Sequence, residues 1–238
     1  MIQYRIQYKV KIIEIIDETN NVKTYLLEKP GQLNWNAGSH ALFGLDYMDG
    51  EEVTDWTLFR YMSLITRSKE GKLGFSTKVP GSSSQFKVKL SKLQVGDEIG
   101  IFRVGSVLEA KRCNQAIIFL SMGVGIATMR PLIHTYIDDM TNVPYMINVN
   151  TNATGEYLYR DELEKLECNH YKNYWLKSRI EFYKLLEELT EVKNAIYYIV
   201  GSDDFMKDVI KELKSKEVDP SNIILDRLEE FAHSFYGL

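Results

Sequence analysis

The stretch Ser121-Met122-Gly123-Val124-Gly125-Ile126-Ala127-Thr128 decides the fold of this chain. The apolar run 116–120 precedes it and predicts a buried strand. The run behind it is amphipathic, and Pro131, which helices tolerate only in their first turn, places the helix start close to the glycines. The helical spacing is carried by Met129, Leu132, Ile133, Tyr136, Ile137 and Met140. A strand, a glycine turn and a helix in this order aim backbone N–H groups at a phosphate.

A second glycine turn strengthens this signal, which is weak alone because the third glycine of the dinucleotide fingerprint is missing. The strand-like run 195–200 ends at Gly201-Ser202, and a helix follows. The structural alternative is that Asp203 or Asp204 simply caps that helix. Ligands of doubly wound sheets bind outside the carboxyl ends of the strands, so two glycine turns there favour a nucleotide.

The first half of the chain consists of short strand-like segments joined by frequent turns, including one at 17–21, with one short helix expected near 84–92. This pattern of short strands and frequent turns predicts an antiparallel β-barrel. The expected strands are 8–15, 22–27, 40–45, 58–66, 73–78 and 98–102.

After about residue 112, strands and helices alternate, which predicts an α/β doubly wound parallel sheet. The expected strands are 115–121, 144–150, 172–177, 195–200 and 222–226, and the expected helices are 127–140, 158–167, 180–191 and 203–216. The boundary should fall between Leu108 and Asn114, so we assign 1–110 to the barrel domain and 111–238 to the α/β domain.

Composition excludes several classes of protein. The 238 residues carry a formal net charge of −4, which provides no basic footprint for a nucleic acid. The sequence shows no secretory signal and no apolar run of membrane-spanning length, so we expect a cytoplasmic protein. Cys113 and Cys168 are too few to hold an iron–sulfur cluster. The four histidines, which lack metal-ligand spacing and predict no metal site, are His40, His134, His170 and His233.

Two segments of the barrel half are chemically suggestive. In Arg60-Tyr61-Met62-Ser63, strand alternation places Arg60 and Met62 on one face and Tyr61 and Ser63 on the other. The turn 79–84 offers small residues whose N–H groups and hydroxyls could bind an anion. A surface arginine and an ordinary polar turn are the alternatives.

The order of these motifs resembles the ferredoxin–NADP reductase family over nearly the whole chain. The motifs on which this resemblance rests are R-x-x-S at Arg60, G-x-x-S at Gly81, strand–G-x-G–helix at Gly123 and strand–G-S–helix at Gly201. The resemblance implies a barrel that binds FAD, an α/β domain that binds NAD(P), and direct hydride transfer between nicotinamide C4 and flavin N5.

The resemblance also implies residue roles. Arg60 would bind the flavin phosphate, Met62 would pack on the isoalloxazine with Tyr61 as the alternative, and Ser63, the catalytic residue, would lie near N5. The residues near the FAD pyrophosphate would be Lys78, Gly81, Ser82, Ser83 and Ser84. The nicotinamide-nucleotide loop would comprise Gly123, Val124, Gly125, Ile126, Ala127 and Thr128, with Gly201 and Ser202 in a second loop.

The chain departs from the family pattern at several of these positions. Met62 replaces the usual tyrosine, Met122 a glycine, Thr128 a proline and Val200 a cysteine. The C-terminal tail extends past the family's usual end, and either of two aromatic residues there, Phe231 or Tyr236, could cover the flavin.

The sequence favours NADP(H) over NAD(H). Ser178-Arg179 follows a strand-like segment where family members carry an S-R pair for the 2′-phosphate, and a guanidinium pairs well with a phosphate dianion. A competing alignment makes Arg179 a structural residue at the start of a helix. A carboxylate closing the strand 144–150 would favour NAD, and Asn148 and Asn150 stand there instead.

The resulting hypothesis is a flavoprotein reductase that passes electrons between NAD(P)H and a second acceptor. That acceptor would be a separate ferredoxin or flavodoxin, or a small molecule, because the chain lacks cluster cysteines. The alternative is a flavin-binding electron-transfer subunit of a larger complex with weak NAD(P)H turnover of its own.

Overall fold

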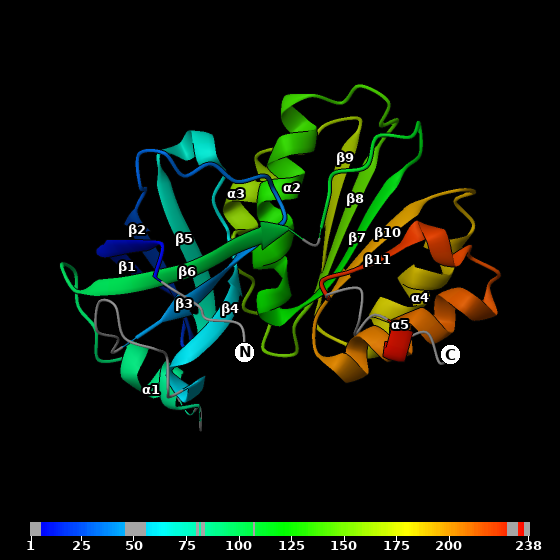
Figure 1. Cartoon of the computed structure of the whole chain (residues 1–238). Coiled ribbons are helices and arrows are strands. Elements are labelled where there is room, and N and C mark those ends of the chain that lie inside the picture. Colours follow the sequence, from blue (N-terminus) through cyan, green and yellow to red (C-terminus); the bar gives the residue numbers. More distant parts are fainter. Residues whose placement is uncertain are drawn as a thin grey trace. The chain divides into compact units, whose positions relative to one another are not determined.

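The computed structural model describes residues 6–45, 56–79, 81, 84–106, 108–227 and 233–235. The chain divides into two units, Met1–Ser106 and Val107–Leu238 (Figure 1). Among the described residues, no helix combines the length and apolar content needed to cross a membrane.

The first unit is built on a six-stranded antiparallel sheet in the order β4-β3-β6-β1-β2-β5. Just past β4, the Ile65 N–H donates to the Gly74 carbonyl of β5 at 2.9 Å, which brings the two outer strands together and closes the barrel. The elements are β1 (Tyr8–Thr19), β2 (Val22–Glu28), β3 (Ser39–Gly44), β4 (Phe59–Ser63), β5 (Lys72–Lys78), β6 (Glu98–Ser106), α1 (Gln85–Leu90) and the 3-10 turns Trp56–Leu58 and Ser68–Glu70.

The barrel encloses an apolar core in which Phe75 stacks on Tyr25 with 5.4 Å between ring centroids. Phe86 and Leu90 of α1 belong to the same core. The antiparallel barrel predicted from the sequence is confirmed.

The first hairpin turn is tighter than predicted. The turn expected at 17–21 contains only residues 20–21, because β1 continues to Thr19. Two pairs of side chains hold the strands together there: Lys23 contacts Asp17 at 2.7 Å, and Thr24 donates to Glu18 at 2.7 Å.

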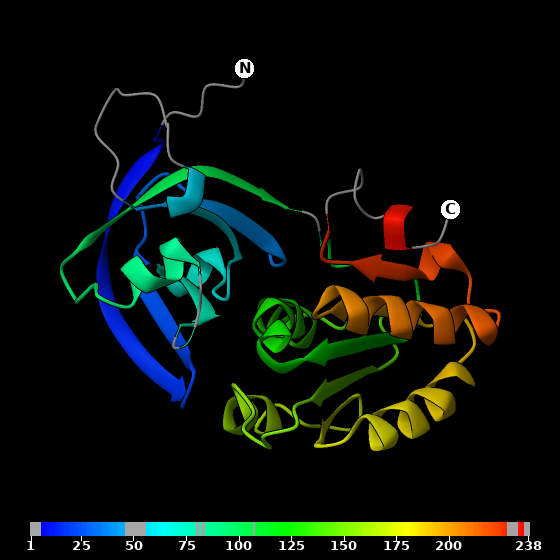
Figure 2. The same ribbon diagram turned by 90° about the horizontal axis from the view of Figure 1, so that it is seen from below.

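The second unit is a five-stranded parallel sheet in the order β11-β10-β7-β8-β9, so the predicted doubly wound α/β fold is also confirmed. Helices α4 and α5 cover one face, while α2 and α3 lie on the other (Figure 1, Figure 2). The elements are β7 (Ile117–Met122), α2 (Ile126–Asp138), β8 (Met146–Thr151), α3 (Arg160–Glu164), β9 (Tyr171–Leu176), α4 (Arg179–Thr190), β10 (Ile196–Val200), α5 (Asp203–Ser215), β11 (Ile223–Leu225) and the 3-10 turns Gly123–Gly125, Pro220–Asn222 and His233–Phe235.

Strand alternation divides the side chains of β7 between the two layers. Ile118 and Leu120 join the core formed with α4 and α5. Phe119 points the other way, with its ring centroid 6.1 Å from that of Tyr136 on α2 and 5.3 Å from that of Tyr198 on β10. The central strand is therefore buried on both faces, as a parallel sheet requires.

Two buried phenols hold the segment that opens the second unit. The Tyr136 and Tyr198 hydroxyls lie 3.1 Å apart. Tyr198 donates to the Glu109 carbonyl at 2.5 Å and accepts from the Lys111 N–H at 3.0 Å, while Tyr136 donates to the Lys111 carbonyl at 2.8 Å. Burial raises the pKa of both phenols, so each remains a neutral hydrogen-bonding group. These bonds attach residues 109–111 to the α/β unit.

A polar cluster joins α2 to α3. Arg130 contacts Glu162 through two hydrogen bonds of 2.9 and 2.6 Å, and His134 lies 2.7 Å from the same carboxylate. Burial would raise the pKa of Glu162, but the hydrogen bonds from His134 and Arg130 outweigh it and lower this pKa from 4.5 to about 2. Helix α3 covers only Arg160–Glu164 of the predicted 158–167, and the left-handed backbone at Tyr159, with φ of 58°, sets its start at Arg160.

We predict that Glu162→Gln loses part of the acid sensitivity of the fold. The folded-state pKa of Glu162 is depressed, so its stabilising contribution is present above about pH 4.5 and is lost as the pH falls toward about 2. Urea unfolding between pH 5 and pH 3 should therefore show the wild-type advantage over the variant shrinking. Glu164→Gln, which breaks an exposed pair with Arg160, is the matched control with little effect. A wild-type advantage independent of pH over that range would contradict the assignment.

Candidate functional site

The first glycine turn lies at the carboxyl end of β7. Gly123 adopts a φ of 55°, in the left-handed region that favours glycine, and the 3-10 turn Gly123–Gly125 leads directly into α2. Gly125 has an ordinary helical φ of −58°, but a Cβ there would lie 2.6 Å from the Val200 carbonyl oxygen. Only glycine fits because the backbones of the two turns approach so closely.

The second glycine turn follows β10, which pairs with β7 so that Val200 lies beside Ser121. A Cβ on Gly201 would meet the Phe205 ring at 2.5 Å and the Met122 Cβ at 3.3 Å. The two turns, nearly eighty residues apart in the sequence, therefore lie side by side at the carboxyl edge of the sheet.

The helix cap after the second turn differs from the structural alternative considered for the sequence. The N-cap of α5 is Ser202, whose hydroxyl oxygen accepts from the Phe205 N–H at 3.3 Å. Asp203 is the first residue of the helix and contacts Arg227 at 2.7 Å. Neither Asp203 nor Asp204 is the cap.

Ala127 and Thr128 are both buried at the start of α2. The Thr128 hydroxyl donates to Asp226, just past β11, at 3.5 Å. Its side chain thus faces into the unit, and an anion at the turn would meet these two residues through their backbone. Val124 and Gly123 are partly exposed.

Ser178 and Arg179 follow β9, the strand whose register with β8 pairs Leu176 with Thr151. Ser178 is the N-cap of α4 and forms a reciprocal capping box with Glu181. The Arg179 side chain is 61% exposed and lies 3.6 Å from Asp208. Ser178 thus has a structural role as a helix cap, while the guanidinium of Arg179, the residue that the competing alignment makes structural, remains accessible to solvent.

In the barrel unit, the segment Arg60 to Ser63 forms most of β4. Met62 packs against the barrel core, whereas Tyr61 is 45% exposed with its ring edge on His40, 5.3 Å between centroids. Ser63 lies opposite His40 in the register of β3 and β4. Tyr61 and Ser63 share the face that the alternation predicted.

Positive charges gather beside the turn that precedes α1. Burial lowers the pKa of Lys87, and the nearby charges of Lys78 and Arg60 lower it further. Gly81 adopts a left-handed φ of 72°. Ser82 and Ser83 lie outside the described residues, and Ser84 is the N-cap residue of α1.

Sequence reasoning missed three contributors to these sites. Lys87 gave no signal, because its place near Lys78 and Arg60 depends on the packing of three separate elements. His40 gave no signal, because its place beside Ser63 depends on strand register. The sequence marks Asn150 only as a non-acidic residue at the end of a strand, whereas the structure places its amide 3.3 Å from the Gly123 carbonyl. Asn148 and Asn150 are both buried, so neither is available to a ribose.

The C-terminal aromatics considered for the flavin, Phe231 and Tyr236, lie outside the described residues. Phe235 is described. It is buried against the core of the second unit, and the cations of Lys207 and Arg227 lie over its ring, 5.6 and 5.7 Å from its centroid.

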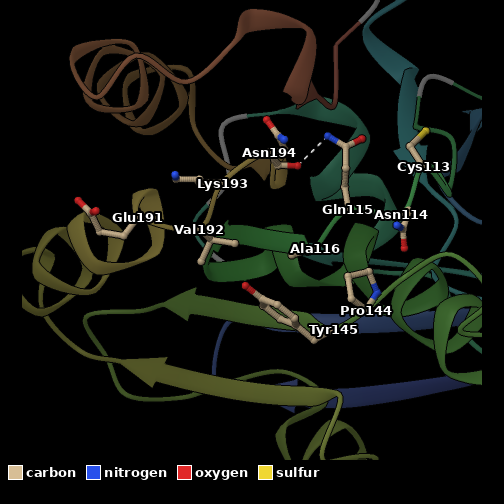
Figure 3. A pocket seen from close by; sticks show the side chains of 10 residues that line it. All are labelled: Cys113, Asn114, Gln115, Ala116, Pro144, Tyr145, Glu191, Val192, Lys193 and Asn194. Atoms are coloured by element: carbon tan, nitrogen blue, oxygen red, sulfur yellow. Dashed lines mark hydrogen bonds between the residues drawn. The ribbon is translucent and has the colours of Figure 1, made fainter.

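A cavity of about 730 Å³ lies at the amino ends of β7 and β8, the opposite edge of the sheet from the glycine turns (Figure 3). Gln115 crosses it and donates to the Asn194 carbonyl at 2.6 Å. Because this cavity lies at the opposite edge of the sheet, it does not belong to the candidate site at the glycine turns. In the part of the chain that the structure describes, no group of three or more His, Cys, Asp or Glu side chains could hold a metal ion.

Comparison with known proteins gives a consistent fold. No family model and no curated protein matches the sequence. A ferredoxin NADP+ reductase from Neisseria gonorrhoeae, solved with bound FAD and NADP, is 16% identical with a TM-score of 0.75, and the match covers 92% of this chain and 97% of that chain. A variant of the Plasmodium falciparum ferredoxin-NADP+ reductase is 18% identical with a TM-score of 0.75, and the match covers 93% of this chain and 98% of that chain. The CS-b5R domains of human Ncb5or are 16% identical with a TM-score of 0.76, and the match covers 92% of this chain and 69% of that chain.

The similar structures cover both the antiparallel sheet and the parallel sheet of this chain, since each match spans more than nine-tenths of it. The resemblance stated from the motifs is thus confirmed at the level of the fold: the chain has the two-domain fold of the ferredoxin–NADP+ reductases.

Proposed function

We propose that this protein is an FAD-dependent oxidoreductase that passes electrons between NAD(P)H and a second acceptor. The observation that carries the proposal is the contact between the two glycine turns, where a Cβ on Gly125 would lie 2.6 Å from the Val200 carbonyl. Close-packed glycine turns leave backbone N–H groups unobstructed, and such groups bind the phosphates of dinucleotides at the carboxyl edge of a sheet.

The barrel unit fits a flavin nucleotide by its charge. Burial lowers the pKa of Lys87, and the nearby charges of Lys78 and Arg60 lower it further, so three cations lie near one another in this unit. A diphosphate would compensate these charges through charge-assisted hydrogen bonds. That the Neisseria reductase was solved with FAD and NADP supports this choice of cofactors.

When bound, the two cofactors would supply hydride transfer between nicotinamide C4 and flavin N5. The role of the chain is to bind and orient them. Arg60 would pair with the flavin phosphate, and the Ser63 hydroxyl would donate a hydrogen bond at N5. Met62 or Tyr61 would lie against the ring, and their exposures favour Tyr61, since Met62 packs on the barrel core.

The nucleotide we propose is NADP(H). Gly123, Val124 and Gly125 would contact its phosphates through the backbone, and Gly201 would lie beside the nicotinamide. Arg179, which is exposed at the start of α4, would bind the 2′-phosphate in competition with its contact to Asp208.

The second acceptor would be a separate ferredoxin or flavodoxin, or a small molecule, in the cytoplasm. Cys113 and Cys168 are both exposed and not disulfide-bonded, which suits a reducing compartment. The alternative, an electron-transfer subunit with weak turnover of its own, would bind flavin without rapid reduction by either nucleotide.

The proposal predicts that the purified protein shows the absorbance band of oxidised flavin and that anaerobic NADPH bleaches it. Ser63→Ala should retain flavin but be reduced about tenfold more slowly, since one hydrogen bond is removed near the reacting atom. Ser91→Ala, on an exposed helix end, is the control and should match the wild type. Flavin that neither NADPH nor NADH reduces would favour the subunit, and a protein that takes up no flavin would refute both functions.

Gly125→Ala should weaken NADP+ binding and lower the stability of the fold by about 1–3 kcal/mol, because the new methyl group must displace the Val200 carbonyl. Gly31→Ala is the matched control, because no heavy atom of the described residues lies within 4 Å of its Cβ position. Thermal unfolding and titration of the oxidised protein with NADP+ would measure both effects. Unchanged affinity and stability in Gly125→Ala would contradict the assigned geometry.

Arg179→Ala should raise the KM for NADPH about tenfold and leave the KM for NADH unchanged, because only NADPH carries the phosphate that the guanidinium would bind. Asp208→Asn removes the competing carboxylate and should leave the KM for NADPH equal or lower. Steady-state assays with both nucleotides would measure these effects. Equal changes for the two nucleotides would show that Arg179 is structural.

A further inference from the structure

Asn150 is a buried amide beneath the first glycine turn. It lies in β8, between Ser121 of β7 and Trp175 of β9 in the register of the sheet, and only 1% of its surface is exposed. Val149 joins the core under α4 and α5, so alternation turns Asn150 toward the face that carries α2.

The amide nitrogen of Asn150 reaches the turn. Its Nδ2 donates to the Ser121 hydroxyl at 2.8 Å and to the Gly123 carbonyl at 3.3 Å. Ser121 in turn donates to the Val149 carbonyl at 3.4 Å, so its oxygen is free to accept from the amide. The orientation of the amide is fixed, because the Gly123 carbonyl can only accept.

The other half of the amide is unused within the part of the chain described. The Asn150 Oδ1 is buried and has no hydrogen-bond partner. Such an oxygen costs stability that an apolar side chain of the same size would not. The presence of an amide at this position is therefore explained by its NH2 group, which donates to the Gly123 carbonyl of the turn.

Holding the Gly123 carbonyl also fixes the next N–H group. The carbonyl of Gly123 and the N–H of Val124 belong to one planar trans peptide, in which they point in opposite directions. With the carbonyl held toward the sheet by Asn150, the Val124 N–H is turned away from it.

We propose that Asn150 is a positioning residue, which orients the Gly123–Val124 peptide so that its N–H group faces a phosphate of the bound dinucleotide. This inference rests on the proposed function, because it requires a dinucleotide at the turn. Asn150 acts through the backbone of the turn and does not itself touch the ligand.

Asn148 offers a matched control. It lies two residues earlier in the same strand and on the same face, it is fully buried, and its Oδ1 also has no partner among the described residues. Its Nδ2 donates to Asn173 of β9 at 2.9 Å and not to the turn. Leucine is close to asparagine in shape, so Asn150→Leu and Asn148→Leu remove the donor with little change in packing.

The test compares both variants with the wild-type holoprotein, by NADP+ titration and by hydrogen exchange of the peptide 121–128 without nucleotide. Asn150→Leu should weaken NADP+ binding about tenfold, roughly the effect of one misdirected hydrogen bond to a charged group, and should speed exchange in this peptide. Asn148→Leu should keep the Kd within about twofold and leave exchange unchanged.

Equal effects of the two substitutions, or wild-type affinity and exchange in Asn150→Leu, would overturn the inference. If the wild-type protein binds no NADP+ or NADPH, the proposed function fails. The exchange measurement then decides whether Asn150 holds the turn, and wild-type exchange in Asn150→Leu would refute that as well.

Discussion

The close approach of two backbone segments, at Gly125 and Val200, is the constraint on which the second unit depends. A methyl group at Gly125 would lie 2.6 Å from the Val200 carbonyl oxygen. The approach requires β7 and β10 to be neighbours in parallel register, and it brings both glycine turns to one edge of the sheet. The order of the strands and the position of the candidate dinucleotide site are therefore parts of one arrangement.

Polar groups inside the second unit support this arrangement. Asn150 bonds to the first turn from the neighbouring strand, and the two phenols Tyr136 and Tyr198 hold residues 109–111. Each group is buried and makes at least one bond to a backbone carbonyl, so each fixes the path of the chain at a specific place. In the barrel unit the corresponding feature is electrostatic, since Arg60 and Lys78 lie near Lys87.

The features predicted from the sequence are those that depend on local patterns. The strand before Gly123, the helix after it and the alternation beyond residue 112 all follow from periodicity and turn residues. The first-turn position expected for Pro131 is wrong, because α2 already begins at Ile126 and Pro131 lies inside the helix. Helix ends were less predictable, because Ser202 rather than an aspartate caps α5, and a left-handed Tyr159 shortens α3.

Contacts that depend on register could not be predicted. The pairing of His40 with Ser63 and the burial of Asn150 under a turn on another strand arise only when strands are aligned. The convergence of Arg60, Lys78 and Lys87 depends likewise on three separate elements.

Titration of the 15N-labelled protein with NADP+, followed by the amide chemical shifts, locates the dinucleotide on the sheet. The amides of Val124, Gly125 and Gly201 should shift most. Unchanged shifts at these residues, with the largest changes at the opposite edge of the sheet around Gln115 and Asn194, would contradict a dinucleotide site at the glycine turns.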